Sequence, residues 1–253
     1  MRLQIQRRVA VISCEPDSQE PLSFRGKSKT IREITSIRLH ELGLEPIIHR
    51  PLKDISDFPA IGKIGGVVIG GSKLSLHDIE KNDWMKKLLD FIQRTHGKVP
   101  ILGLCFGHQA VGISFGSKLE QFNSTIGCEV GFSEVARTAE SANDPLLGEG
   151  PAMFDALFSH FDYLATESPH FTVLLRSLNL ENHSIQAFRA GDSTWGLQFH
   201  PEYTTGVVRD LVIARQKILE PIIDVDSVLF GLCRIHRADT APLRNFVNFM
   251  THD

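Results

Sequence analysis

Short apolar runs alternate with helical patterns through the first half of the chain. A capping box of Thr30 and Glu33 predicts a helix that Gly43 ends, and apolar positions at helical spacing predict another over residues 78–96. Strands separated by helices indicate a doubly wound, mostly parallel α/β sheet with flanking helices. The runs with the length and β-branched content of buried strands are residues 9–13, 46–49, 66–69 and 99–104.

The second half of the chain has a different pattern. Short strand-like runs follow one another over residues 118–138 and 156–199, and only residues 163–169 interrupt them with loop-like composition. Successive short strands joined by turns are typical of antiparallel structure. We therefore expect a small antiparallel extension that continues or flanks the parallel sheet.

The C-terminal part of the chain is predicted to be helical. One stripe of mainly apolar positions runs from Val207 to Leu219, includes Arg215, and stops before Pro221. Two shorter helices follow, and no internal repeat or linker marks a domain boundary. The expected organisation is one domain over residues 1–253, with its core at about residues 8–206 and C-terminal helices at about 207–251.

Composition narrows the classes of protein to consider. Of the 253 residues 42% are hydrophobic and 23% charged, which is ordinary for a globular protein. A net charge of −3 gives no electrostatic reason to expect nucleic acid or an anionic membrane as a partner. The four cysteines form no C-x-x-C pair, which argues against a zinc site and a disulfide scaffold. With no secretory signal and no apolar run long enough to span a membrane, we expect a cytoplasmic protein.

Cys105 stands where a predicted strand passes directly into a helix. Gly103 and Gly107 flank it at two residues' distance, which is the pattern of a nucleophile elbow. At a helix N-terminus, backbone N–H groups and the helix dipole favour an anion, so we expect the pKa of this thiol to fall below about 8.5. The other three cysteines lack these surroundings and are predicted to be buried structural residues: Cys14, Cys128 and Cys233.

A nucleophilic thiolate needs a base, and the base needs a group that orients it. A strand pattern runs into His200, and Glu202 follows two residues later. In an extended chain these two side chains face the same side, so Glu202 is placed to hold the imidazole in one tautomer. A metal site of these two residues with His160 and Asp162 is the alternative, but it leaves the cysteine elbow unexplained.

These segments together resemble the class I glutamine amidotransferase superfamily. The sequence GLCFGHQ contains Cys105, and HPE contains His200 and Glu202. Between and before them, in the family's order, stand a GVVIGGS segment, Glu129-x-Gly131 and Ser159-His160-x-Asp162. Each pattern is weak alone, but their order over most of the chain is specific. The resemblance implies a flavodoxin-like sheet and a Cys105, His200, Glu202 triad.

The resemblance also implies a mechanism in which Cys105 attacks the γ-carbonyl of glutamine and forms a γ-glutamyl thioester, which water hydrolyses. By the same likeness, the backbone N–H groups of Gly71 and Phe106 hold the oxyanion, and Gln109 contacts the amino-acid end of the substrate. One departure is that Ser72 and Lys73 follow the glycine pair, where the family often has proline. A less rigid oxyanion loop is therefore expected.

Three functions are compatible with these residues. The first is a glutamine amidotransferase or glutaminase subunit of the free-standing, GMP-synthase-like branch, with a synthetase or ammonia acceptor on a partner chain. The second is a γ-glutamyl peptidase that acts on glutathione-like compounds and works alone. The third is a catalytically silent regulatory protein of the same fold, which the complete triad disfavours. None of them calls for a metal or another cofactor, and the sequence contains no Walker A loop for ATP.

Overall fold

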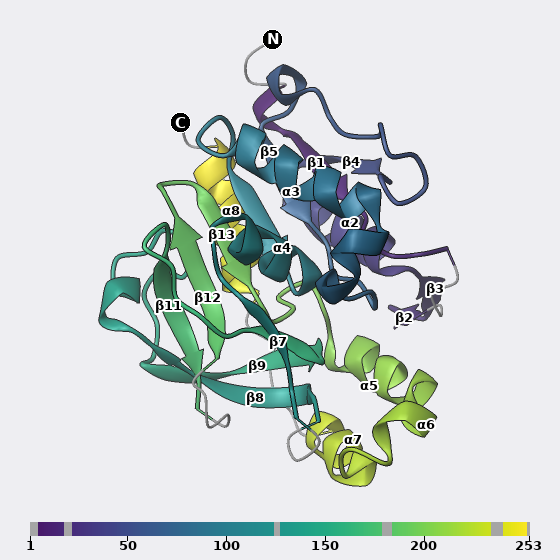
Figure 1. Cartoon of the computed structure of the whole chain (residues 1–253). Coiled ribbons are helices and arrows are strands. Elements are labelled where there is room, and N and C mark those ends of the chain that lie inside the picture. The colour runs from purple at the N-terminus through teal and green to yellow at the C-terminus, as the bar shows by residue number, and fades with distance from the viewer. Residues whose placement is uncertain (1–4, 18–21, 124–126, 179–183, 234–239, 252–253) are drawn as a thin grey trace.

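The computed structural model describes residues 5–17, 22–123, 127–178, 184–233 and 240–251. Its main feature is a nine-stranded mixed sheet in the order β4-β1-β5-β6-β13-β12-β11-β8-β9 (Figure 1). The central strand of this order, β13 (Thr194–Leu197), divides the sheet into a parallel and an antiparallel half. The predicted α/β class, a doubly wound and mostly parallel sheet with flanking helices and an antiparallel extension, is confirmed.

The parallel half of the sheet is formed by the strands that the sequence predicted. All pairings from β4 through β1, β5 and β6 to β13 are parallel, so these strands end at one edge of the sheet. That edge is where open α/β sheets bind their ligands. The strands that precede β13 in this half are β4 (Glu45–His49), β1 (Arg8–Ile12), β5 (Gly66–Ile69) and β6 (Ile101–Leu104).

The antiparallel half contributes four of the nine strands. They are β12 (Ile185–Ala190), β11 (Thr172–Ser177), β8 (Glu129–Arg137) and β9 (Met153–His160), and each pairing from β13 to β9 is antiparallel. The antiparallel extension predicted for the second half of the chain is thus confirmed. Two small antiparallel sheets pair β7 (Leu119–Gln121) with β10 (Asp162–Leu164) and β2 (Leu22–Phe24) with β3 (Lys27–Lys29).

Helices cover both faces of the parallel half: α2 (Ile31–Glu41), α3 (Asp83–Thr95), α4 (Phe106–Ser114) and α8 (Ala241–Thr251). Successive residues of β1 point to opposite faces, which explains why the strand is apolar at every position after the exposed Arg8. Val9 and Val11 pack in one core cluster with residues of α2 and α8. Ala10 and Ile12 pack in another with residues of α3 and α4. α2 begins at the predicted capping box.

A third apolar cluster lies at the end of the sheet, where α5 (Thr205–Ala214), α6 (Gln216–Leu219) and α7 (Val225–Cys233) gather beside β8 and β9 (Figure 1). Leu22 and Phe24 of the β2–β3 hairpin pack there with Val208 and Leu211 of α5. The hairpin therefore holds α5 against the body of the molecule.

Two predicted helices are interrupted. The segment 78–96 forms a 3₁₀ helix, η2 (Leu76–Lys81), and then α3, with Asn82 in extended backbone between them (φ −133°, ψ 92°). The Asn82 side chain donates a 2.8 Å hydrogen bond to the Asp78 carbonyl, which is how asparagine competes with helix continuation. The predicted helix over 207–219 likewise breaks at Arg215 (φ −106°, ψ 11°) into α5 and α6.

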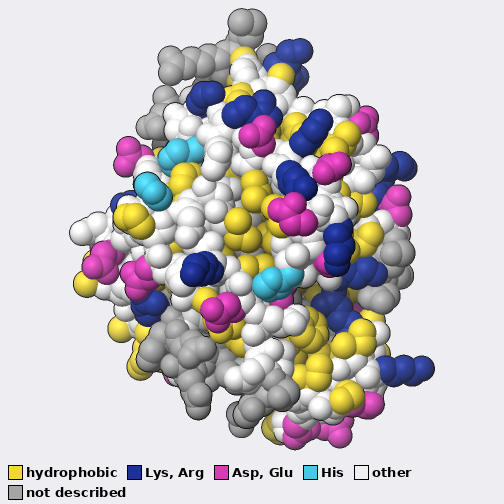
Figure 2. Space-filling view, viewed as in Figure 1, with side chains coloured by type: hydrophobic (Ala, Val, Ile, Leu, Met, Phe, Trp, Pro, Cys, Tyr) yellow, Lys and Arg dark blue, Asp and Glu magenta, His cyan; other side chains and the backbone are white. Residues whose placement is uncertain are grey.

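The surface and the helix lengths bear on possible partners. Within the described residues, no helix is both long and apolar enough to cross a membrane. Basic and acidic side chains are interspersed over the face shown in Figure 2. This mixture fits the small net charge of the sequence and offers no single-sign stripe on that face.

The glycines around Cys105 are required by packing of α4 against the sheet. A Cβ atom on Gly103 would lie 2.4 Å from the carbonyl oxygen of Gly107, and one on Gly107 would lie 2.2 Å from the carbonyl oxygen of Ile69. Because both obstacles are backbone atoms, no side-chain movement can relieve them. The glycines therefore allow α4 to begin directly against β5 and β6.

We predict that Gly107→Ala destabilises the fold by roughly 3 kcal/mol, because an added methyl must displace the β5 backbone. In a chain of this size the melting temperature should fall on the order of 10 °C in a thermal unfolding scan. The matched control is Gly231→Ala in α7, where an added Cβ meets nothing within 4 Å. That change should leave stability unchanged or raise it by up to about 1 kcal/mol. Equal melting temperatures for the two variants would contradict this account of the elbow.

Candidate active site

Cys105 occupies a strained turn between β6 and α4. Its backbone angles are φ 51° and ψ −102°, and among the described residues Arg25 alone shares a positive φ without being glycine. Hydrogen bonds on both sides fix the turn: Cys105 N donates to the Leu197 carbonyl at 2.8 Å, and Gln109 N donates to the Cys105 carbonyl at 3.1 Å. Strain of this kind persists when the surroundings enforce it, and it is concentrated at functional sites. The backbone thus has the predicted elbow conformation.

His200 and Glu202 form a buried pair next to this turn. His200 Nδ1 lies 2.8 Å from Glu202 Oε1, and the two side chains are 3% and 0% exposed. The His200 ring stacks on Tyr203, with ring centres 4.0 Å apart and 3° between the planes. Both the carboxylate and the stacked ring hold the imidazole in one orientation.

The route by which His200 meets Glu202 differs from the prediction. An extended chain through His200 was expected to bring the two side chains to the same side, but β13 ends at Leu197. The residues from His200 to Tyr203 instead form a turn closed by a 3.2 Å hydrogen bond from Tyr203 N to the His200 carbonyl. Pro201 at the second position favours such a turn, because its ring fixes φ near the value required.

The charge state of His200 depends on its two neighbours. Burial alone lowers the pKa of an imidazole, but the charges of Glu202 and Cys105, with hydrogen bonds to both, raise the pKa of His200 to about 10. His200 is therefore an imidazolium at neutral pH. A cation beside the Cys105 sulfur stabilises the negative charge of a thiolate.

The other buried histidines are engaged elsewhere. His108 packs its ring against Phe188, and burial lowers the pKa of His108 to about 3, so it is neutral at physiological pH. His160 Nε2 bonds Glu129 Oε2 at 2.8 Å, and its Nδ1 lies 2.9 Å from the Asp162 carbonyl. Burial opposes the charge of Glu129, yet the bond to His160 keeps the pKa of Glu129 below its usual value. Within the described residues, no three His, Cys, Asp or Glu side chains are grouped as a metal site would require.

The loop after β5 reaches the same place. A Cβ atom on Gly71 would lie 3.1 Å from His200 Cε1 and 3.7 Å from Cys105 Cβ, so glycine allows the loop to approach both side chains. The Ser72 hydroxyl donates to the Cys14 carbonyl at 2.7 Å and accepts from Leu74 N at 3.0 Å. The first of these bonds ties the loop to the chain beyond β1, and the second closes a turn within the loop. The lower rigidity expected of this loop stays a prediction.

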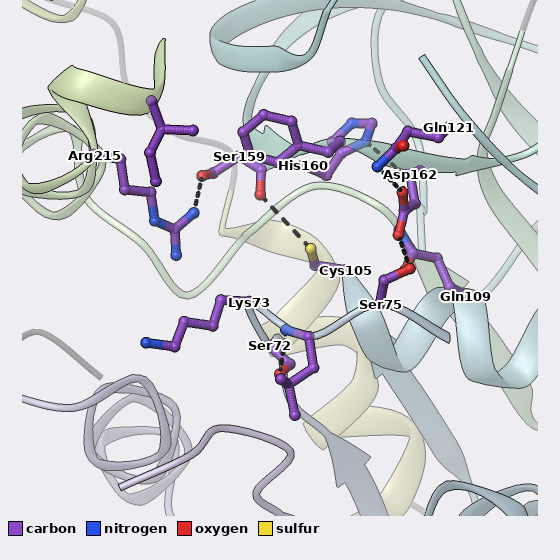
Figure 3. Close-up of a pocket in the computed structure, with 13 residues that line it drawn as sticks. Ser72, Lys73, Ser75, Cys105, Gln109, Gln121, Ser159, His160, Asp162 and Arg215 are labelled. Carbon is purple, nitrogen blue, oxygen red and sulfur yellow. Dashed lines mark hydrogen bonds between the residues drawn. The ribbon is translucent and has the colours of Figure 1, made fainter. Parts of the chain in front are cut away.

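A cavity of about 320 Å³ opens beside Cys105. On one side of the sulfur lie Gln109, Gln121, Ser75 and Asp162 (Figure 3). The Asp162 carboxylate accepts from Ser75 Oγ at 2.5 Å and from Gln121 Nε2 at 3.2 Å. Together these polar groups are suited to bind a ligand's amino and carboxyl groups.

Gln109 contributes to this side of the cavity through its amide oxygen. Its Nε2 donates to the Asp162 carbonyl at 2.8 Å and to Gln198 Oε1 at 3.2 Å. Because both amide hydrogens have protein acceptors, the amide oxygen is the group available to a ligand's donor. On the opposite side of the sulfur lie Lys73 and Arg215 (Figure 3).

The structure brings together all the residues that the sequence singled out. Cys105 lines both the main cavity and a smaller recess that includes Gly71 and His200. Phe106 is the first residue of α4, where its N–H has no partner carbonyl within the helix. Two residues of the site, Tyr203 and Arg215, were not predicted from the sequence. Arg215 carried a signal, because it was a charged residue within an otherwise apolar stripe.

The other cysteines differ from one another. Burial raises the pKa of Cys14 far above its usual value and that of Cys128 to about 11, which fits structural residues. Cys233, predicted to be buried, is instead exposed on α7. The apolar pattern of α7 did not reveal which of its faces points to solvent. An experiment with thiol reagents therefore has to account for Cys233.

The sequence is similar to those of several known proteins. The model of the family "Glutamine amidotransferase class-I" matches residues 28–218. Gamma-glutamyl peptidase 3 of Arabidopsis thaliana is 31% identical over 63% of this chain and 64% of its own length. The GMP synthase [glutamine-hydrolyzing] of Porphyromonas gingivalis W83 is 30% identical over 55% of this chain and 25% of its own. The chain thus spans less than two thirds of the length of these curated relatives.

Solved structures show the same fold. A glutamine amidotransferase from Thermotoga maritima superposes with a TM-score of 0.76 at 20% identity, covering 98% of this chain and 99% of that one. A glutamine amidotransferase from Methylobacillus flagellatus gives a TM-score of 0.65 at 19% identity, covering 97% of this chain and 94% of that one. At such identities the likeness is evidence for the fold.

We predict that NMR of isotope-labelled histidine will give a titration midpoint for His200 near pH 10. In Glu202→Gln the midpoint should fall by about two pH units, because burial continues to oppose the imidazolium while one opposing charge is lost. The control Glu134→Gln removes an exposed carboxylate of β8 and should leave the midpoint unchanged. A wild-type midpoint near the ordinary value of about 6.5 would contradict the proposed pairing.

Proposed function

The chain belongs to the glutamine amidotransferase class-I family, and from this premise we propose that it hydrolyses the γ-amide bond of glutamine or of another γ-glutamyl compound. The proposal rests on one arrangement of groups: an imidazole, a cysteine sulfur and a cavity lie next to one another. An imidazole held by Glu202 interacts with the sulfur of Cys105, and that sulfur faces a 320 Å³ cavity. A thiolate, a proton donor and room for a substrate are the requirements of acyl transfer to cysteine.

In the first half of the proposed reaction, the Cys105 thiolate attacks the γ-carbonyl carbon and its oxygen becomes an oxyanion. Backbone N–H groups of Gly71 and Phe106 are the proposed donors to that oxyanion, each worth roughly 3 kcal/mol in comparable sites. The C–N bond then breaks, and the departing nitrogen takes the proton of the His200 imidazolium. This step leaves a γ-glutamyl thioester on Cys105 and a neutral imidazole.

In the second half, water attacks the thioester carbonyl and gives a proton to His200. The C–S bond breaks, glutamate leaves, and the thiolate–imidazolium pair is restored. Glu202 keeps the imidazole aimed at the sulfur through both halves of the reaction. The proposed binding role of Gln109 is to accept a hydrogen bond from the substrate's amino group through its amide oxygen.

Two branches of this chemistry differ in the leaving group. A glutaminase subunit releases ammonia and hands it to a synthetase or another acceptor on a partner chain, as the matches to GMP synthases suggest. A γ-glutamyl peptidase releases an amino acid or peptide and needs no partner, as the name of the Arabidopsis relative suggests. Both require Cys105, so they share the central proposal. A free thiolate of this kind also suits a reducing compartment such as the cytoplasm.

We predict that Cys105→Ala lowers hydrolysis of glutamine and of γ-glutamyl dipeptides by roughly 10⁴-fold or more, because no other group can form the thioester. Turnover by purified protein, with glutamate as the product measured, is the test. The control is Cys233→Ala, which removes the exposed cysteine of α7 and should retain wild-type rates. Thermal unfolding should confirm that both variants fold. Near-wild-type turnover by a folded Cys105→Ala variant would refute the proposed function.

A further inference from the structure

Arg215 is unusual among the residues of the cavity because of its place in the fold. It caps the C-terminus of α5 and precedes α6, and its N–H donates to the carbonyls of Leu211 and Val212. Four residues after Leu211, it continues the apolar stripe that buries α5. The break in the helix lets the arginine side chain reach the cavity instead of the core (Figure 3).

The Arg215 guanidinium is only lightly engaged by the protein. Its Nη1 donates a hydrogen bond to Ser159 Oγ at 3.4 Å, near the limit of such bonds. None of the ion pairs among the described residues includes it, whereas the half-buried Arg32 is paired with Glu15 at 2.9 Å. A half-buried guanidinium without a carboxylate at a cavity wall is suited to bind an anion in two-pronged geometry.

The position of Arg215 relative to Cys105 indicates which part of a substrate it contacts. Asp162 and Gln109 lie on one side of the sulfur, and Lys73 and Arg215 lie on the other (Figure 3). Arg215 also lines the recess that contains His200. Because His200 protonates the departing nitrogen in the proposed reaction, the leaving group has to be on the His200 side. Arg215 therefore lies on the path of the leaving group.

We propose that Arg215, which lines this cavity together with Lys73, binds a carboxylate on the leaving group. This inference rests on the proposed function and narrows its substrate class. The preferred substrates are γ-glutamyl amino acids or short peptides whose amine portion bears a carboxylate. When the C–N bond breaks, the amine carries the proton from His200 and its carboxylate stays paired with Arg215 until release. Ammonia from glutamine has no carboxylate and makes no use of this subsite.

The test compares two substrates that differ only at the proposed contact, γ-glutamylglycine and γ-glutamylglycinamide. We expect the wild type to prefer the carboxylate over the amide in kcat/KM by roughly tenfold or more, which corresponds to one charge-assisted contact. Arg215→Gln should reduce that ratio to near one. Lys217→Gln removes an exposed neighbouring cation that lies outside this cavity and should leave the ratio unchanged.

Two outcomes would overturn the inference. If the wild type hydrolyses both dipeptides equally well, no leaving-group carboxylate is recognised. If Arg215→Gln lowers kcat/KM equally for both dipeptides and for glutamine, the guanidinium binds the shared glutamyl carboxylate instead.

Measurements of ligand binding test this inference independently of the proposed function. Calorimetry with Cys105→Ala should show the same preference for γ-glutamylglycine over its amide, and Arg215→Gln in that background should remove it. A wild type that hydrolyses neither dipeptide nor glutamine would refute the proposed function, while the binding preference would still decide the role of Arg215. Equal binding of the two ligands to Cys105→Ala would refute the inference alone.

Discussion

The candidate site depends on the parallel pairing of β6 with β13. Leu104 lies opposite Leu197 in that pairing, so both strands end at the same level of the sheet. The hydrogen bond from Cys105 N to the Leu197 carbonyl continues the ladder by one residue and fixes the elbow. A shift of register by one residue would turn each side chain to the other face and separate the sulfur from the imidazole. The central position of β13 makes such a shift difficult, because β12 holds its other edge.

Two buried imidazole–carboxylate pairs lie at this edge, and their settings differ. The pair of His200 and Glu202 borders the sulfur. In the other pair, His160 Nδ1 also bonds the Asp162 carbonyl, and Glu129 also accepts a hydrogen bond from the Gln186 side chain. Burying such charges is costly unless each is paired, so removing one partner is expected to destabilise by about 3–5 kcal/mol. The second pair stiffens the strand β9 and the turn to Asp162 that form the far wall of the cavity. The pair of His200 and Glu202 keeps a proton next to the nucleophile.

Patterns with a local physical cause could be predicted from the sequence. The strands around Val9 and Val68, the capping box at Thr30 and the elbow at Cys105 each follow from neighbouring residues. Features set by tertiary contacts could not. The turn at Pro201 depends on where β13 ends, the β2–β3 hairpin is too short to show a period, and the exposure of Cys233 depends on which face of α7 is covered. Arg215 was only partly predictable: its charge interrupted an apolar stripe, but the sequence did not show that a cavity lies beside it.

The central claim is that Cys105 carries a covalent γ-glutamyl group during turnover. It can be tested most directly by rapid acid quenching of the protein with excess substrate, followed by intact-protein mass spectrometry and peptide mapping. The Cys233→Ser background excludes adventitious modification of the exposed thiol. The account predicts one glutamyl group per chain, located on the peptide that contains Cys105 and discharged when the substrate is exhausted. Steady turnover with no adduct on Cys105 at any quench time, or an adduct on another residue, would contradict it.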